Sequence, residues 1–143
     1  MIRYLELPKI PNSIIDNLPA DWKQYDQKVS YSGSNYTWTN SFNQEINSWC
    51  QEHISQGMYF GFQIMTGNVP MHKDVGTLTK LVYLLQPGGK NVTTNFYNDD
   101  RTLAHSFVIE PFRWHVLRAD SFHSVDHIEP DQVRFSITGR IFP

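Results

Sequence analysis

The clearest chemical feature of the sequence is a short run that places two metal-ligating side chains close together, His72-Lys73-Asp74. In an extended segment, side chains at i and i+2 leave the same face of the backbone. The imidazole and the carboxylate can then reach one ion while Lys73 faces away. An H-x-D triplet also occurs often by chance, and a salt-bridged surface turn is the alternative interpretation. A metal site therefore needs a third ligand from elsewhere in the chain.

His123 is the candidate for that third ligand, because it lies between apolar residues in Phe122-His123-Ser124-Val125. Two imidazoles and one carboxylate form the facial triad of non-haem Fe(II) sites, which leaves coordination positions open. Zn²⁺ with three protein ligands is the chemical competitor. A core histidine bonded to a backbone carbonyl is the structural alternative for His123.

Arg134 and Ser136 are candidates for an anion site beside the metal. Arg134 follows His123 by eleven residues, and this spacing across one turn predicts adjacent antiparallel strands. A guanidinium aimed into a barrel is costly unless an anion meets it, and its planar fork binds a carboxylate through two hydrogen bonds. Ser136 shares a face with Arg134. H-x-D, a late histidine and R-x-S in this order favour a metal site next to an anion site.

The elements that must position these residues are short strands separated by turn signals. We predict strands at 58–66, 79–86, 93–97, 105–110, 114–118, 121–125 and 132–142. Many short strands at even spacing indicate a sandwich or a barrel. In the last of them, Phe135 and Ile137 point to one face, while Arg134 and Ser136 point to the other.

Residues 1–57 read as a helical and irregular cap on that strand region. Helices are predicted at 12–18 and at 41–56, the second with a capping box in Ser41-Phe42-Asn43-Gln44. Its apolar face is formed by Phe42, Ile46, Trp49, Cys50 and Ile54. We expect this helix to cover the outside of one sheet. The aromatic segment 24–40 is either a lid or simple packing onto the barrel.

Composition sets broad limits on the class of protein. The chain has 143 residues, which suits a single domain over 1–143, with the cap at 1–57 and the core at 58–143. A net charge of −2 gives no clear signal for nucleic-acid or membrane partners. The single cysteine, Cys50, predicts a reducing compartment, and with no apolar leader or span in the sequence we expect the cytoplasm.

The strand region resembles the Fe(II)/2-oxoglutarate-dependent dioxygenases, and within them the prolyl-hydroxylase-like group. The matching pieces are His72-Lys73-Asp74, Leu81-Val82-Tyr83-Leu84-Leu85, Gly88-Gly89, Thr94-Asn95-Phe96-Tyr97, Phe122-His123-Ser124-Val125 and Arg134-Phe135-Ser136-Ile137. The resemblance implies a mainly β, double-stranded β-helix, that is a cupin-like jelly roll with N-terminal helices on one sheet. It further implies that His72, Asp74 and His123 ligate Fe(II). Arg134, aided by Ser136, would hold the distal carboxylate of 2-oxoglutarate, with O₂ as the other co-substrate.

A further 2-oxoglutarate contact is expected from an early core strand, where many relatives place a tyrosine. Alternation puts Lys80 and Tyr83 on opposite faces of the predicted strand 79–86. Either of them, or Gln63, is a candidate for this contact.

The activity implied by the resemblance is hydroxylation of a small molecule or of a peptidyl residue, including a prolyl residue. One alternative is a cupin-like metalloenzyme that does not use 2-oxoglutarate. The other is a non-catalytic jelly-roll binding module, in which the three candidate ligands would not converge. His105, His115 and His127 compete as metal ligands, and His127 is expected in an exposed turn before the last strand.

Overall fold

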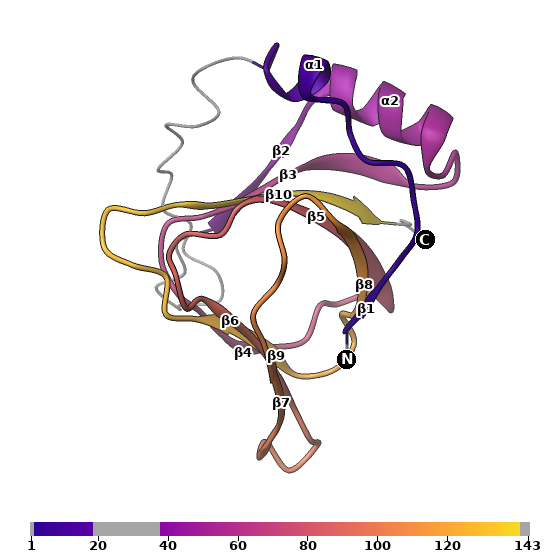
Figure 1. The fold of residues 1–143 in the computed structure, drawn as a ribbon. Coiled ribbons are helices and arrows are strands. Elements are labelled where there is room, and N and C mark those ends of the chain that lie inside the picture. The colour runs from indigo at the N-terminus through magenta and orange to yellow at the C-terminus, as the bar shows by residue number, and fades with distance from the viewer. Residues whose placement is uncertain (1, 19–37, 141–143) are drawn as a thin grey trace.

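The strands form two antiparallel sheets that face each other across a central space (Figure 1). The computed structural model describes residues 2–18 and 38–140. The larger sheet contains, in spatial order, β1 (Ile2–Tyr4), β8 (Trp114–Arg118), β5 (Thr79–Gln86), β10 (Arg134–Arg140), β3 (Tyr59–Met65) and β2 (Trp38–Phe42). The smaller sheet contains β4 (Val69–His72), β9 (His123–Asp126), β6 (Thr93–Tyr97) and β7 (Leu103–Phe107). From β3 onward the chain passes back and forth between the sheets, except at the β6–β7 hairpin within the smaller sheet. The fold is the expected jelly roll.

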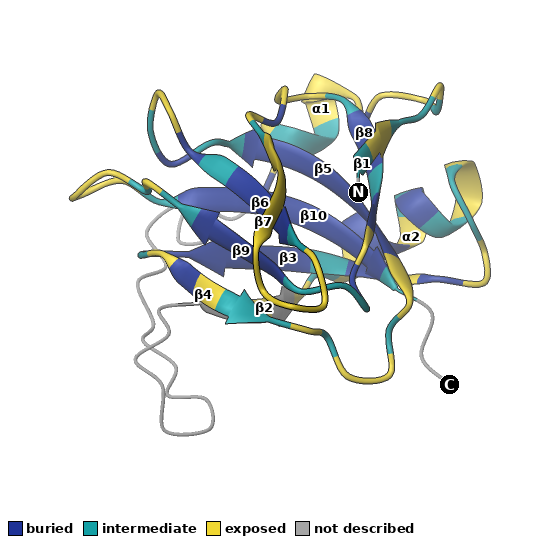
Figure 2. Cartoon of the chain, turned by 90° about the horizontal axis from the view of Figure 1, so that it is seen from below, coloured by how far each residue is buried: buried dark blue, intermediate teal, exposed yellow. Residues whose placement is uncertain are grey.

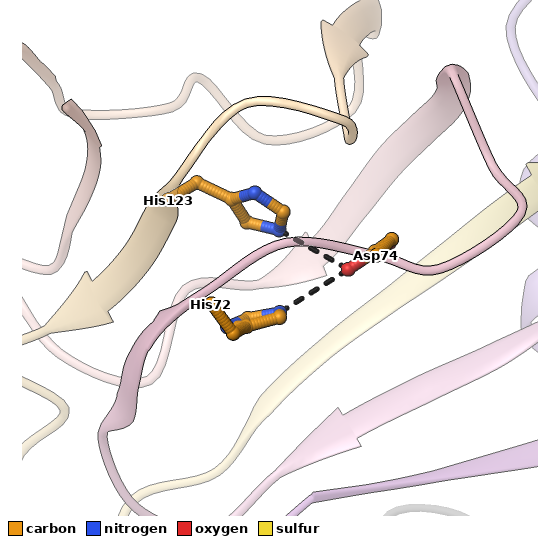
Figure 3. Close-up of side chains that lie close together, drawn as sticks. All are labelled: His72, Asp74 and His123. Atoms are coloured by element: carbon orange, nitrogen blue, oxygen red, sulfur yellow. Dashed lines mark ion pairs between the residues drawn. The ribbon is translucent and has the colours of Figure 1, made fainter. Parts of the chain in front are cut away.

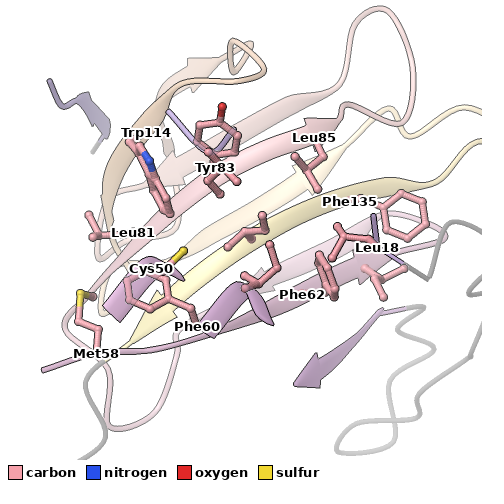
Figure 4. Close-up of a cluster of buried hydrophobic side chains, with 14 residues drawn as sticks. Leu18, Cys50, Met58, Phe60, Phe62, Leu81, Tyr83, Leu85, Trp114 and Phe135 are labelled. Atoms are coloured by element: carbon pink, nitrogen blue, oxygen red, sulfur yellow. The ribbon is translucent and has the colours of Figure 1, made fainter. Parts of the chain in front are cut away.

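The two helices lie over the outer face of the larger sheet (Figure 1). They are α1 (Asn12–Ile15) and α2 (Gln44–His53). Ile46 and Cys50 of α2 are fully buried and share one apolar cluster with Phe135 and Ile137 of β10 (Figure 4). Each large side chain buried in this way contributes about 1.5–3 kcal/mol. The expectation that a helix covers one sheet is therefore confirmed, and the apolar core lies between α2 and the larger sheet.

Side-chain alternation divides the larger sheet into a core face and a cavity face. On β10, Phe135 and Ile137 enter the apolar core, while Arg134 and Ser136 line the cavity between the sheets. On β5, Lys80 lines the cavity. In Figure 2 the strands around the cavity are mostly buried, whereas β7 is exposed along most of its length. The inner face of the larger sheet is consequently where polar groups can meet a ligand away from solvent.

The start of helix α2 differs from the sequence prediction. Ser41 and Phe42 end the edge strand β2, which pairs with β3. The N-cap is Asn43, whose Oδ1 accepts a hydrogen bond from the Ile46 N–H at 3.0 Å. The predicted capping box is therefore wrong, and Phe42, 64% exposed, does not belong to the helix face. Backbone pairing with β3 outweighed the helical spacing of the apolar residues.

Several other boundaries shift because short edge elements carry weak sequence signals. Helix α1 is a single turn, and β1, β2 and β4 were not predicted. Strands β1 and β2 make residues 1–57 part of the larger sheet as well as a cap on it. The strand expected at 105–110 is β7, at Leu103–Phe107. Of the candidate lid 24–40, residues 38–40 belong to β2 and the rest lies outside the described residues. Within the described part of the chain, no helix has the length and apolar character to cross a bilayer.

Gly139 of β10 is packed so closely against the Phe60 ring that a Cβ atom would overlap it. We expect Gly139→Ala to lower the free energy of unfolding by about 2 kcal/mol, because Phe60 is fully buried and cannot move aside freely. Urea unfolding followed by tryptophan fluorescence measures the effect. Gly57→Ala is the matched control, since the nearest atom to its Cβ is Ser55 Oγ at 4.0 Å. Equal midpoints for the two variants would contradict the prediction.

Candidate metal centre

Three potential metal ligands come from two neighbouring strands of the smaller sheet and from the segment that follows one of them. His72 ends β4 and His123 begins β9, and the two residues are cross-strand partners. Asp74 follows two residues after His72, where its N–H donates to the Ala119 carbonyl at 2.9 Å. Figure 3 shows the three side chains turned toward one another. Strand pairing therefore brings the two imidazoles together, and the backbone hydrogen bond to Ala119 holds the Asp74 segment beside them.

The donor atoms of this set lie at distances that suit one shared ion. Asp74 Oδ1 is 3.2 Å from His72 Nε2 and 3.3 Å from His123 Nε2. All three atoms lie within 4.8 Å of one another. Two ligands about 2.1 Å from one ion and at a right angle to each other lie about 3 Å apart. The arrangement can therefore bind a metal ion through a face of three donors.

Backbone carbonyls fix both imidazoles in the tautomer that metal binding requires. His72 Nδ1 lies 2.8 Å from the Pro70 carbonyl, and His123 Nδ1 lies 2.7 Å from the Ser121 carbonyl. A carbonyl oxygen only accepts, so each Nδ1 carries the proton and each Nε2 presents a lone pair to Asp74. His123 Nε2 is buried and has no hydrogen-bond partner among the described residues. Lone pairs that converge on a carboxylate oxygen need a cation between them, and the donor chemistry fits a divalent metal.

The charge of Asp74 is held firmly by its surroundings. Burial by itself would raise the pKa of this carboxyl. Hydrogen bonds from His123 and His72 when their imidazoles are protonated, together with the Lys80 ammonium, outweigh burial and hold the pKa well below its usual range. Lys80 Nζ lies 3.4 Å from Asp74 Oδ2. Oδ2 is therefore occupied by Lys80, and Oδ1 is the oxygen that faces the two imidazoles.

A cavity of about 200 Å³ opens from the metal set into the space between the sheets. Its apolar wall is formed by Met65, Val69, Val82, Leu117 and Val125. Its polar wall includes Gln63, Thr94, Ser136, Lys80, Arg134 and Arg140. A ligand in this space would contact the metal set on one side and cationic side chains on the other.

Arg134 is buried on the cavity wall without an acidic partner. Its side chain is 6% exposed and donates to the Pro87 carbonyl at 3.4 Å and to Thr94 Oγ1 at 3.3 Å. No described carboxylate forms an ion pair with it. Burial lowers the pKa of Arg134 to about 10, so the guanidinium remains charged at neutral pH. A buried charge of this kind is costly unless a ligand supplies the anion.

The structure brings most of the sequence-predicted residues to the cavity, with one exception. Ser136, Lys80 and Gln63 line it together with Arg134. Tyr83 lies on the other face of β5, where its ring packs against Trp114 with a centroid distance of 5.0 Å. The proposed contact between Tyr83 and a co-substrate therefore has no support from its position.

The expected adjacency of the strands that carry His123 and Arg134 is wrong. Strand β9 lies in the smaller sheet and β10 in the larger one. The connection crosses from one sheet to the other, with positive φ at His127 and Asp131. Both His123 and Arg134 nevertheless line the cavity, because they approach it from facing sheets.

Sequence reasoning missed two cavity residues and left a third without a role. Thr94 holds the Arg134 guanidinium, and Arg140 lines the cavity at the far end of β10. His115 is 1% exposed and lines the cavity from β8, outside the set of three converging donors. Period-two alternation along each strand was the available signal for all three. His127 is exposed and His105 lies on exposed β7, so neither joins the metal set.

His115 makes a specific contribution to the pH dependence of stability. Burial, helped by the charges of Arg134 and Lys80, lowers its pKa from 6.5 to about 4. As the pH falls below about 6.5, the His115 imidazole is protonated in the unfolded chain but stays neutral in the folded chain. Protonation therefore favours the unfolded state, and the free energy of unfolding decreases. Between pH 7.5 and 5 the loss from this residue is about 2 kcal/mol.

The measurement is the free energy of unfolding at both pH values for wild type and His115→Gln. The variant should lack this part of the acid destabilisation, while the exposed control His105→Gln should behave as wild type. An identical pH slope in wild type and His115→Gln would show that the prediction is wrong.

Comparison with known proteins shows the fold of this chain. No protein-family model and no curated protein matches the sequence. Among solved structures, a 2OG-Fe(II) oxygenase family oxidoreductase from Burkholderia pseudomallei aligns with a TM-score of 0.55 and 10% identity, over 90% of this chain and 75% of that one. Peruvianin-I from Thevetia peruviana latex aligns with a TM-score of 0.52 and 11% identity, over 90% and 73%. These likenesses show a shared jelly-roll fold.

The two neighbours carry different chemistry on this fold, so the site of each chain must be read separately. Peruvianin-I is described as a cysteine peptidase. In this chain the single cysteine, Cys50, is buried in the core under α2, and burial raises its pKa to about 12. A thiol in that environment is a poor nucleophile. The cavity with the His72, Asp74 and His123 set is the better candidate for chemistry.

Proposed function

We propose that this chain is an Fe(II)- and 2-oxoglutarate-dependent oxygenase that hydroxylates its substrate. The observation that carries the proposal is a pairing within one cavity. Three converging donors form an open metal site, and a buried guanidinium without an acidic partner lies on the opposite wall. The first feature supports a redox metal with free positions, and the second supports an organic acid bound next to it.

His72, Asp74 and His123 would hold Fe(II), and Arg134 would bind the distal carboxylate of 2-oxoglutarate. Thr94 and the Pro87 carbonyl orient the guanidinium, and Ser136 lies beside it on the same face of β10. The chemistry that a bound Fe(II) supplies is the decarboxylation of 2-oxoglutarate by O₂ to succinate and CO₂, coupled to hydroxylation of a C–H bond. The apolar cavity wall limits the access of water to this reaction.

The main alternative is a cupin-like metalloenzyme that uses the same three ligands without 2-oxoglutarate. It accounts for the metal set but gives Arg134 no role. The buried charge favours the 2-oxoglutarate proposal, because removing a guanidinium from water without a compensating anion costs several kcal/mol. A non-catalytic jelly-roll module predicts that the three donors fail to converge, whereas they lie within 4.8 Å of one another.

The deciding experiment is anaerobic addition of Fe(II) and then 2-oxoglutarate to the purified protein. We expect a visible charge-transfer absorption that requires both additions and saturates at one equivalent of each per chain. Succinate should then form when O₂ is admitted. Iron binding without any 2-oxoglutarate-dependent absorption would favour the cupin-like alternative. If the protein binds no iron, the non-catalytic jelly-roll binding module is the remaining candidate function.

A further inference from the structure

The cavity carries more positive charge than the proposed co-substrate can neutralise. Of the described residues that line it and are not exposed, three are cationic and one is acidic: Lys80, Arg134 and Arg140, against Asp74. Lys73 also borders the cavity, but it is exposed, and its ammonium lies over the Phe122 ring. A divalent ion at Asp74 would increase the excess. One dianion bound at Arg134 would still leave the half-buried Arg140 without an anionic partner among the described residues, and an unpaired charge away from water is costly.

Arg140 is the cavity cation farthest along β10 from Arg134. The two residues share a face of the strand and are six positions apart, so their backbones are separated by about 20 Å. Their guanidinium groups are held by different neighbours. Arg134 bonds to Pro87 and Thr94, whereas Arg140 Nη2 bonds to Asn40 Oδ1 at 3.5 Å. A single five-carbon diacid that chelates the metal cannot also contact both arginines.

The metal set lies between the Arg134 end and the Arg140 end of the cavity, and the position of Lys80 shows this. Gly139 pairs with Leu81 across β10 and β5, so the next pair along the strands brings Arg140 beside Lys80. Lys80 is 5% exposed and reaches Asp74. At the other end, the Arg134 guanidinium rests on Thr94 of β6, the strand whose Phe96 pairs with His123. The cavity therefore runs from Arg134 past the metal set to the Lys80 and Arg140 end.

No described carboxylate forms an ion pair with Arg140. Its hydrogen bond to the amide oxygen of Asn40, which uses Nη2, leaves most of the guanidinium donors available to a ligand. A guanidinium beside a buried ammonium forms a site that favours carboxylate, phosphate or sulfate groups.

We propose that the Arg140 and Lys80 end of the cavity is a second oxyanion subsite, which binds an acidic group of the substrate. The assignment of its occupant as the substrate rests on the proposed function, since that function already places 2-oxoglutarate at Arg134. The substrate class is then a small molecule with a carboxylate or phosphoryl group at one end. The C–H bond to be oxidised lies toward the metal set.

The test measures oxyanion binding directly, with Zn(II) as a redox-inert metal probe. Full-length Zn(II)-loaded protein is saturated with 2-oxoglutarate and titrated at low ionic strength with sulfate and, separately, with acetate. The arginine Nε–Hε signals are followed by NMR. We expect a saturable shift of the Arg140 signal. Stronger binding of sulfate indicates a phosphoryl-type group on the substrate, and stronger binding of acetate indicates a carboxylate.

Variants locate the site. Arg140→Gln should weaken oxyanion binding by about tenfold or more and leave 2-oxoglutarate affinity nearly unchanged. Arg140→Lys should retain part of the binding, which separates loss of charge from loss of fold. Arg118→Gln is the matched control, because Arg118 is exposed and paired with Asp120 at 2.7 Å.

Three outcomes would overturn the proposal: no saturable shift for either anion, binding that Arg140→Gln leaves intact, or anion binding that is present without 2-oxoglutarate and lost when 2-oxoglutarate is added. The proposed function fails separately, if 2-oxoglutarate itself does not bind the metal-loaded protein. In that case the same titration without 2-oxoglutarate still decides whether Arg140 binds oxyanions.

Discussion

Replacing His123 by alanine will lower the affinity of the protein for one divalent metal ion by about a thousandfold or more. The loss is large because His123 is buried with its Nε2 already directed at Asp74 and its Nδ1 proton fixed by the Ser121 carbonyl. Changes to residues that only orient a ligand cost ten- to hundredfold, and removing the ligand itself costs more. Calorimetric titration with Zn(II), and with Fe(II) under anaerobic conditions, measures the effect.

Two other histidines serve as matched controls for this measurement. His127→Asn should leave metal affinity unchanged, because His127 is exposed and asparagine tolerates its φ of 69°. His115→Gln should also retain the metal, since His115 lies outside the converging set. Full metal affinity in His123→Ala would remove the basis of the proposed centre. Loss of affinity in His115→Gln would mean that the ligand set is different.

Replacing Arg134 by glutamine will lower the affinity for 2-oxoglutarate by about a hundredfold while metal affinity stays within a few-fold of wild type. The guanidinium is the group proposed to hold the distal carboxylate, and a charge-assisted bidentate pair in a buried site is strong. Arg134 is not among the three converging donors, so the metal should be retained. Titration of the anaerobic charge-transfer absorption gives the first affinity, and calorimetry with Zn(II) gives the second.

The stability of the same variant separates a ligand-binding role from a structural one. The buried Arg134 guanidinium has no acidic partner among the described residues, so its removal should leave the free energy of unfolding unchanged or slightly higher without ligand. A marked loss of stability with unchanged 2-oxoglutarate affinity would make Arg134 a structural residue. Lys80 is less suitable for this comparison, because it is paired with Asp74.

Alternation along strands made the essential part of the site predictable from sequence. It placed Arg134 and Ser136 on the face opposite Phe135 and Ile137, and the structure has them so. It also separated Lys80 from Tyr83 without showing which residue faces inward. Which of the two residues faces the cavity depends on the side of the sheet on which α2 packs. The helix packs on the side that carries Tyr83, so that side becomes the apolar core.

The remaining differences come from long-range pairing, which has no local signature. The pairing of β2 with β3 withdrew Ser41 and Phe42 from the predicted helix. The eleven-residue spacing between His123 and Arg134 was consistent with a hairpin. The chain instead crosses between the sheets, and this crossing depends on the closure of the whole jelly roll.

The two sheets supply different parts of the proposed chemistry. The metal donors come from β4, β9 and the turn that follows β4, whereas Arg134, Ser136, Lys80 and Arg140 all come from the larger sheet. Each imidazole is oriented by a carbonyl two residues earlier in its own segment. Substitutions on the larger sheet can therefore change which acids are accepted while the metal ligands stay in place. In evolutionary terms, such a scaffold can acquire new specificities without passing through a metal-free intermediate.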